Sequence, residues 1–235
     1  MIFNRIRLAA SILKSNFTRL RRPYKVTHAI TYDCNGRCRN CGIRRKKKGR
    51  QMNLEQIQEF YQANSHLNWI DLTGGEIFMR DDVPEILDSI IRECPHLVNL
   101  HFPTNGLLTR KIIDTVESAS KKVKDKFIIS VSMDGPPSLH DHLRGVDGCW
   151  IKAVETYKIL RDIPNVGAYL GFTVSQNNMG RLEDTFKSVN EIIPELKLGD
   201  FHVNLIHHSS HYYMNEPEKL PGEKVMDEIN WFIKS

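Results

Sequence analysis

Three cysteines stand within eight residues of one another near the start of the chain. Cys34, Cys38 and Cys41 have the spacing Cys-x3-Cys-x2-Cys and follow an apolar run at 26–30. Three thiolates on one loop can bind one soft metal centre, but a structural zinc site needs a fourth protein ligand. No fourth cysteine lies nearby, and a 4Fe-4S cluster held by three thiolates leaves one iron open to another ligand. The pattern therefore favours a cofactor site over a structural staple.

Two further polar segments follow apolar runs later in the chain. Gly74, Gly75 and Glu76 come after the run at 67–72, and the segment from Ser132 to Arg144 begins at the end of the run at 127–132. Glycines allow close approach of the backbone, and a carboxylate suits an ammonium group. Arg can donate two hydrogen bonds to a carboxylate through its planar guanidinium. Each segment alone is typical of an ordinary turn, so its meaning depends on the cysteines.

The apolar runs alternate with segments of helical periodicity. We expect strands at 26–30, 67–72, 97–102, 127–132, 166–174 and 201–206. We expect helices that begin after Asn53 and near Asp82, one around 112–116, one at 151–160, one that ends near 193 and one at 221–233, with a long loop at 133–148. Six alternations with nearly continuous apolar strands predict a parallel sheet covered by helices. Every candidate motif follows a strand, at the face that carries the chemistry in α/β barrels.

The cysteine spacing, the Gly-Gly-Glu triplet and the segment from Ser132 to Arg144 together resemble the signature of the radical S-adenosylmethionine (radical SAM) enzymes. The nearest branch is that of the peptide-modifying and anaerobic sulfatase-maturing enzymes. The resemblance implies an α/β fold, a partial (β/α)6 barrel of the TIM type over residues 26–235. It also implies a 4Fe-4S cluster on the three cysteines and S-adenosylmethionine at the open iron. Reductive cleavage of this cofactor gives a 5'-deoxyadenosyl radical that abstracts hydrogen from a substrate.

The same resemblance assigns roles to individual residues. Glu76, with its two glycines, would hold the amino group of the cofactor's methionine part, and Ser132 and Arg144 would contact other parts of the cofactor. Asn40 departs from the family, which usually has an aromatic residue before the third cysteine. The cofactor-binding residues expected in total are Ile43, Gly74, Gly75, Glu76, Asn105, Ser132, Arg144 and Leu205.

Histidines and tyrosines gather after the sixth expected strand. Among them, His207 and His208 are candidates for proton donors or acceptors in the substrate pocket, since the strand would direct one of the two inward. The alternative is a polar surface loop. The sequence does not choose between these interpretations.

The N-terminal segment 1–25 predicts a basic amphipathic helix, with apolar positions among arginines and lysines. One interpretation is a helix that closes the bottom of the barrel. The other is peripheral contact with an anionic membrane surface or a partner. No run of about 18 apolar residues occurs, so we expect no transmembrane segment.

The bulk composition is that of a globular protein with one large domain. The chain has 235 residues, of which 40% are hydrophobic and 26% are charged, and its net charge is +5. Cys94 and Cys149 stand alone, so a disulfide framework is not expected and the cytoplasm is the predicted location. No cysteine-rich segment follows the last strand, so we expect either no C-terminal auxiliary-cluster domain or a sequence that stops short of one.

The leading hypothesis is therefore an enzyme that acts on an unidentified substrate, a peptide or a small molecule. The resemblance implies an electron donor such as flavodoxin or ferredoxin. The alternative is a non-catalytic metal-binding module, with zinc completed by a distant histidine, that contacts nucleic acid or acidic partners through basic segments such as 44–50. Nucleic acid is disfavoured because no aromatic residues are interleaved with those charges.

Overall fold

The computed structural model describes residues 2–46, 49, 51–123, 127–215 and 220–234. Within this part of the chain, six parallel strands form one open sheet in the order β1-β2-β3-β4-β5-β6. The strands are β1 (Lys25–Thr31), β2 (Trp69–Gly74), β3 (Asn99–Thr104), β4 (Phe127–Ser132), β5 (Val166–Val174) and β6 (Phe201–Leu205). The predicted α/β partial barrel is confirmed, although β2 and β3 begin two residues later than expected.

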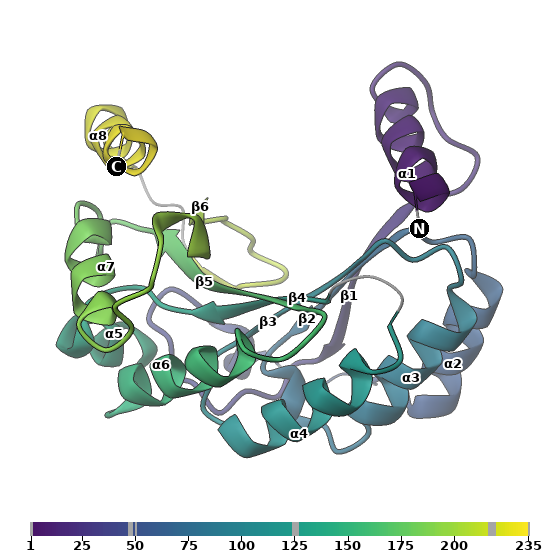
Figure 1. Ribbon diagram of the computed structural model, residues 1–235, viewed down its shortest axis with the longest axis horizontal. Helices are drawn as coiled ribbons and strands as arrows, with labels where there is room; N and C mark the ends of the chain where they lie inside the picture. Colours follow the sequence, from purple (N-terminus) through teal and green to yellow (C-terminus); the bar gives the residue numbers. More distant parts are fainter. Residues whose placement is uncertain (1, 47–48, 50, 124–126, 216–219, 235) are drawn as a thin grey trace.

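Helices cover the outer face of this sheet (Figure 1). The helices are α1 (Ile2–Ser15), α2 (Leu54–Ala63), α3 (Val83–Glu93), α4 (Thr109–Ser120), α5 (Pro137–Arg144), α6 (Cys149–Leu160), α7 (Leu182–Asn190) and α8 (Gly222–Lys234). Of these, α1 and α8 stand clear of the sheet at its two ends in Figure 1. Asn53 begins α2 with a capping box, as its sequence predicts. The core lies between the helices and one face of the strands, where Ile70, Leu72, Leu100 and Phe102 are buried.

The other face of the sheet is polar along much of its width. Successive side chains of a strand point to opposite faces, so Asp71 lies opposite its buried neighbours Ile70 and Leu72. His101 and Ser130 alternate with buried apolar residues in the same way. The inner face of the partial barrel can therefore take part in polar chemistry.

Part of the segment expected as a long loop is helical. Helix α5 occupies residues 137–144 of the expected loop at 133–148, so the prediction was wrong for that part. Pro137 stands in the first helical turn, where the missing N–H costs nothing. Gly145 ends the helix with φ 64° in the left-handed region.

Helix α1 forms at the N-terminus as predicted, but it ends at Ser15 and does not extend over the whole of the expected segment 1–25. Asn4 donates a 3.4 Å hydrogen bond to the carbonyl of Pro95, just before β3, so the helix lies near the amino-terminal ends of the strands. Only Leu8 of this helix is buried, while Phe3 and Ile6 are exposed. The expectation that α1 closes the bottom through its apolar face is therefore wrong. No helix among the described residues is long and apolar enough to cross a membrane.

Candidate functional site

The cysteine loop begins where β1 and β2 run closest together. The N–H groups of Gly75 and Glu76 donate 2.8 Å hydrogen bonds to the carbonyls of Thr31 and Asp33. A Cβ on Gly74 would lie 2.0 Å from the oxygen of Thr31, and one on Gly75 would lie 2.1 Å from the oxygen of Asp33. Both glycines are thus required by the close approach of the chain that leads into the cysteines.

The end of α5 holds the middle of the same loop. The N–H of Arg37 donates to the carbonyl of Arg144, and that of Arg39 donates to the carbonyl of Leu143, both at 2.9 Å. A Cβ on Gly145 would lie 2.6 Å from the carbonyl oxygen of Arg37. The left-handed glycine therefore ends α5 and also makes room for the cysteine loop.

A third attachment comes from the turn after β3. Nδ2 of Asn105 donates a 2.7 Å hydrogen bond to Oδ1 of Asn35, the residue after the first cysteine. Oδ1 of Asn105 also accepts the N–H of Leu107 at 3.0 Å. The side chain of Asn105 is thus committed to protein contacts, and it positions the loop as part of the turn.

The segment 206–215 after β6 covers the end of the loop. The N–H of Gly42 donates to the carbonyl of Tyr213 at 2.6 Å, and Nζ of Lys46 donates to the carbonyl of His211 at 2.9 Å. The hydroxyl of Tyr212 lies 3.1 Å from Oγ1 of Thr73. Part of the basic run at 44–50 therefore binds this segment, while residues 47, 48 and 50 lie outside the described part of the chain.

Two of the three cysteines, Cys34 and Cys38, lie close to Gly36 in the turn of the loop. A Cβ on Gly36 would lie 3.6 Å from Sγ of Cys34 and 3.5 Å from Sγ of Cys38. The N–H of Gly36 donates to Sγ of Cys34 at 3.4 Å, the kind of bond that tunes iron-sulfur clusters. Burial raises the pKa of Cys34 to about 11 and also raises that of Cys41, so their thiolates need a cationic centre for stabilisation.

No three His, Cys, Asp or Glu side chains in the described ranges converge closely enough to hold a single metal ion. This includes the three cysteines of the loop, which are free thiols in this structure. The loop's three sulfur atoms, on one short turn, suit a larger centre better.

Glu76 is a buried carboxylate, only 2% exposed. Its Oε2 accepts the main-chain N–H of Asn105 at 2.7 Å. Its Oε1 accepts the hydroxyl of Thr104 at 2.9 Å and the N–H of Phe78 at 3.4 Å. Burial raises the pKa of Glu76 to about 7, although these hydrogen bonds oppose the shift. A cationic ligand at this carboxylate would stabilise its charged form.

Arg144 joins the cysteine loop to the loop after β4. Its Nη2 lies 2.5 Å from Oδ2 of Asp134, and its Nη1 donates to Sγ of Cys38 at 3.7 Å. Nε of Arg144 is buried and has no partner among the described residues. A buried donor without a partner is costly, and an anionic ligand beside the cysteines would satisfy it. These residues therefore fit a 4Fe-4S cluster with a carboxylate-bearing ligand next to it.

The remaining predicted cofactor residues differ in their surroundings. Ser132 ends β4 beside Gly171 of β5, and Ile43 is buried directly after the cysteine loop. Leu205 ends β6 and is 52% exposed. The structure brings Ser132 and Ile43 to the same rim as the cysteines, whereas it gives Leu205 no enclosed contact surface.

His207 and His208 do not lie where the sequence places them. Strand β6 ends at Leu205, earlier than expected, and both histidines are exposed in the segment that follows. The assumption that the strand directs one of them inward is therefore wrong. The ring of His207 instead lies edge-on to Tyr213, with centroids 6.2 Å apart.

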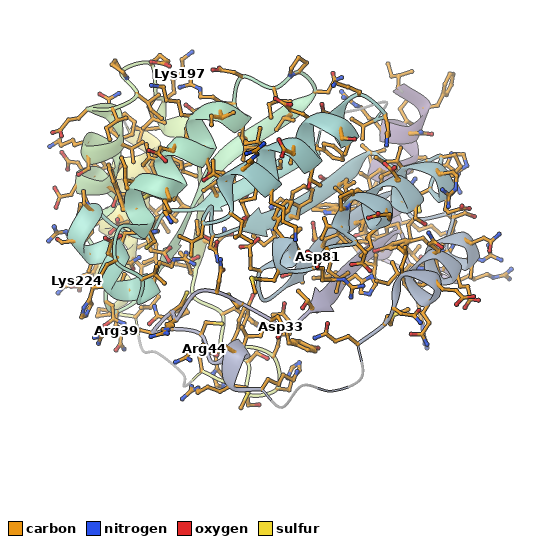
Figure 2. The ribbon with its side chains drawn as sticks, turned by 90° about the horizontal axis from the view of Figure 1, so that it is seen from below. Asp33, Arg39, Arg44, Asp81, Lys197 and Lys224 are labelled. Atoms are coloured by element: carbon orange, nitrogen blue, oxygen red, sulfur yellow. The ribbon has the colours of Figure 1, made fainter. Side chains whose placement is uncertain are left out.

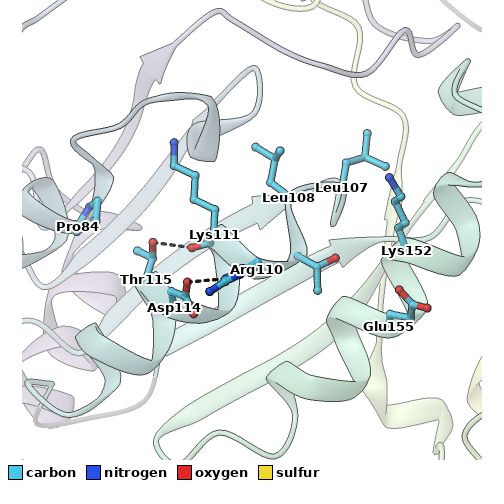
Figure 3. A pocket seen from close by; sticks show the side chains of 10 residues that line it. Pro84, Leu107, Leu108, Arg110, Lys111, Asp114, Thr115, Lys152 and Glu155 are labelled. Atoms are coloured by element: carbon cyan, nitrogen blue, oxygen red, sulfur yellow. Dashed lines mark hydrogen bonds and ion pairs between the residues drawn. The ribbon is translucent and has the colours of Figure 1, made fainter.

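The candidate site occupies one rim of the molecule. Figure 2 shows Asp33, Arg39 and Arg44 near one edge, and Lys197, which precedes β6, at the opposite edge. A pocket of about 650 Å³ lies elsewhere, between α4, α6 and the start of α3 (Figure 3). Its lining includes Arg110 and Asp114, which pair with each other, and it contains none of the predicted site residues. We therefore assign the chemistry to the cysteine rim.

A family model described as the Radical SAM superfamily matches residues 29–189, more than half of the chain. The match includes the cysteine loop, Glu76 and Arg144. The chain belongs to the Radical SAM superfamily. Members of this superfamily use a 4Fe-4S cluster and S-adenosylmethionine, and the buried groups described above fit both.

Radical SAM relatives with known names cover most of this chain but less of their own length. The antilisterial bacteriocin subtilosin biosynthesis protein AlbA of Bacillus subtilis is 28% identical over 72% of this chain and 37% of its own. A probable GTP 3',8-cyclase of Methanococcus vannielii is 25% identical over 83% of this chain and 65% of its own. The chain thus spans less than two thirds of either relative.

Solved structures show the same radical SAM fold. Streptococcus suis SuiB superposes with a TM-score of 0.66 and 14% identity, over 96% of this chain and 48% of SuiB. Methylornithine synthase (PylB) superposes with a TM-score of 0.57 and 12% identity, over 90% of this chain and 63% of PylB. At these identities the likeness concerns the fold.

Sequence reasoning missed several residues that shape this radical SAM site. Asp134 pairs with Arg144, and Asn35 anchors the turn after β3. Both stand inside motifs that were recognised, so an inspection of every polar residue in those motifs could have found them. Tyr212 and Tyr213 belong to the histidines and tyrosines noted after the sixth expected strand, but their contacts with Thr73 and Gly42 depend on how the segment after β6 folds back.

Proposed function

We propose that this chain is the catalytic core of a radical SAM enzyme that modifies a peptide. The observation that carries the proposal is the attachment of the cysteine loop to the β2 turn, the β3 turn and the end of α5. These attachments bring Glu76 and Arg144 to the rim that carries the three cysteines.

Each group at this rim has a role that its surroundings support. Cys34, Cys38 and Cys41 would hold the cluster, with the N–H of Gly36 and the guanidinium of Arg144 as donors to its sulfur ligands. Glu76 would bind the ammonium of S-adenosylmethionine, and Arg144 would meet its carboxylate through the free Nε. When bound, the cluster and cofactor would supply reductive cleavage to a 5'-deoxyadenosyl radical.

The remaining predicted residues would shape the cofactor site. Asn105 and Gly74 hold the backbone in place, while Ser132, Ile43 and Leu205 would border the cofactor. An electron donor such as flavodoxin or ferredoxin would reach the cluster from outside. His207 and His208 would contact substrate at the rim and would not lie inside the barrel.

The peptide substrate is supported by two of the known proteins. AlbA belongs to the biosynthesis of a bacteriocin, and SuiB has been solved with its precursor peptide SuiA. The GTP 3',8-cyclases among the relatives offer the competing substrate class. AlbA is 28% identical over 72% of this chain, whereas the cyclases with higher identity, up to 31%, match about half of it or less. The peptide proposal rests on AlbA and SuiB together.

The experiment is anaerobic reconstitution with iron and sulfide, followed by reduction in the presence of S-adenosylmethionine and chromatography for 5'-deoxyadenosine. We expect its formation by the wild type and its loss in Cys34→Ala, Cys38→Ala and Cys41→Ala. The matched control is Cys94→Ala, because Cys94 is buried at the end of α3 away from the loop. Equal iron content and turnover in the loop variants would contradict the assignment.

The substrate class is tested by additions to the same assay. A panel of synthetic precursor-like peptides is expected to raise 5'-deoxyadenosine formation above the substrate-free rate, while GTP is not. Stimulation by GTP alone would overturn the peptide proposal and leave the radical SAM chemistry in place. About one zinc per chain without inorganic sulfide would instead favour the metal-binding module.

A further inference from the structure

A chain of polar side chains crosses the inner face of the partial barrel. Oδ1 of Asp71 lies 3.4 Å from Nδ1 of His101. Nε2 of His101 lies 3.1 Å from Oγ of Ser130, and the same oxygen lies 3.1 Å from Nδ1 of His202. Four residues from β2, β3, β4 and β6 are thus linked one after another, and the cofactor assignments above use none of them.

The neighbours of Asp71 determine its charge at one end of this row of polar side chains. Asp71 also accepts hydrogen bonds from Nε1 of Trp69 at 2.7 Å, and it pairs with Nζ of Lys25 at 2.8 Å. Burial alone would raise the pKa of Asp71, but bonds from His101, Lys25 and Trp69 outweigh it and lower the pKa to about 2. Asp71 is therefore a permanent carboxylate that can only accept.

The hydrogen-bond partners then indicate which nitrogen of each histidine carries the proton. The 3.4 Å contact between Oδ1 of Asp71 and Nδ1 of His101 is favourable only when Nδ1 carries a proton. Nε2 of neutral His101 then accepts the hydroxyl hydrogen of Ser130. The oxygen of Ser130 then accepts from Nδ1 of His202. Nε2 of His202 is left as a lone-pair acceptor, and it forms no hydrogen bond with any described residue.

The far end of the chain is held in place and accessible. The ring of His202 stacks on Tyr169, with centroids 3.9 Å apart and planes 15° from parallel. His202 is half-buried, and the side chains of Asp71 and His101 are 16% and 28% exposed, so a ligand can reach the inner face. Ser130 precedes Ser132 by two residues on the same strand face, which places the chain about 7 Å below the proposed cofactor site.

We propose that Asp71, His101, Ser130 and His202 form a proton-transfer chain inside the barrel, in which His202 accepts a proton from a bound molecule and His101 stores it. The donor is an acidic S–H, N–H or O–H group of a substrate held beneath the cofactor. This inference rests on the proposed function for its substrate, but the chain itself does not need the cluster.

The transfer balances without any other reagent. When Nε2 of His202 gains a proton, its Nδ1 proton passes to Oγ of Ser130, and the hydroxyl proton of Ser130 passes to Nε2 of His101. His202 ends neutral with its proton on Nε2, and Ser130 ends as a hydroxyl. His101 ends doubly protonated beside the carboxylate of Asp71, which stabilises the new charge. The donor is left as its conjugate base.

This series of proton transfers predicts a change that NMR can detect. Burial and the charge of His101 lower the pKa of His202, so His202 should stay neutral while His101 becomes charged. As the pH falls, the proton on the ring of His202 should move from Nδ1 to Nε2. A tautomer switch of one histidine that accompanies protonation of another is not expected of two independent imidazoles.

The test is nitrogen NMR of the full chain labelled with 15N-histidine, with and without a reconstituted cluster, between pH 8 and about 5, the range in which imidazoles titrate. His101→Gln and His202→Gln assign the signals. We expect the Nδ1 to Nε2 switch of His202 together with double protonation of His101 in the wild type, and loss of the switch in Ser130→Ala and in Asp71→Asn. Ser188→Ala, on the exposed face of α7, is the matched control and should keep it.

The results separate this proposal from the proposed function. Double protonation of His202 without a tautomer switch in the wild type would overturn the proton chain, and so would an unchanged switch in Ser130→Ala. Formation of 5'-deoxyadenosine by the wild type without substrate tests the proposed function separately, because the NMR measurement on the proton chain does not need the cluster. If the wild type forms no 5'-deoxyadenosine, the proposed function is contradicted. The NMR result would still decide whether the proton chain exists.

Discussion

Nδ2 of Asn105 lies 2.7 Å from Oδ1 of Asn35 and donates a hydrogen bond that joins the β3 turn to the cysteine loop, across 70 positions of sequence. The main-chain N–H of Asn105 bonds the carboxylate of Glu76 at 2.7 Å. One turn therefore sets the position of both the first cysteine and the acidic residue proposed to bind the cofactor.

Replacement of Asn35 by Ala should loosen the cysteine loop without removing a ligand. The lost hydrogen bond predicts a fall of about 1 kcal/mol in the free energy of unfolding and a lower iron content after reconstitution and desalting. Thermal unfolding and iron analysis measure the two effects. Asn177→Ala is the control, since its bond to Asn40 is at an exposed position. Equal iron loss in both variants would mean that the Asn35–Asn105 bond has no special role.

Replacement of Gly75 by Ala should disrupt the junction of β1 and β2. The new Cβ would lie 2.1 Å from the carbonyl oxygen of Asp33, so the backbone that leads to the cysteines must move. We expect destabilisation of more than about 3 kcal/mol and loss of cluster binding. Gly199→Ala meets nothing within 4 Å and should change the free energy of unfolding by less than about 0.5 kcal/mol. If Gly75→Ala has the same melting temperature as the wild type, Gly75 cannot lie as close to the carbonyl of Asp33 as the structure indicates.

Glu76 should make stability depend on pH in a defined direction. Burial raises its pKa to about 7 from 4.5, so between these values the folded state binds more protons than the unfolded state. Stability should therefore fall as the pH rises from about 4.5 to 7, by at most about 3 kcal/mol, and then level off. Denaturant unfolding of apoprotein at several pH values measures this. Glu76→Gln should lack this fall in stability between pH 4.5 and 7. The same pH profile in the variant and the wild type would contradict the prediction.

Removal of Arg144 should destabilise the folded protein, because it leaves the largely buried carboxylate of Asp134 without its ion-pair partner. Arg144→Met abolishes the pair with Asp134, and we expect a loss of about 3–5 kcal/mol in the free energy of unfolding. The double variant Asp134→Asn with Arg144→Met should recover part of that loss, since no uncompensated charge remains. Chemical denaturation of the wild type, both single variants and the double variant gives the comparison. Additive effects of the two substitutions would show that the pair does not couple.

Much of the fold could be read along the sequence because the signals are local. Strands β4 and β5 begin and end where their apolar runs predict, and Asn53 caps α2 as expected. Helix α5 was not predicted because its eight residues are mostly polar and only two of them, Leu139 and Leu143, are leucines on one face. Helix α1 was predicted as a helix, but periodicity could not show that its apolar side stays exposed.

The sequence by itself determined which chemical groups this protein offers. Three thiols on one short loop, two glycines before a carboxylate and an arginine after β4 are properties of residue type and spacing, and they indicated the radical SAM family before any coordinates. Only the tertiary structure decided which groups meet. Asn105, Tyr213 and Cys38, the partners of Asn35, Gly42 and Arg144, lie on distant segments. The inner-face chain from Asp71 to His202 depends on how four strands of the sheet are aligned. Residue type fixes what a side chain can donate or accept, but the packing of strands brings donor and acceptor within reach of one another.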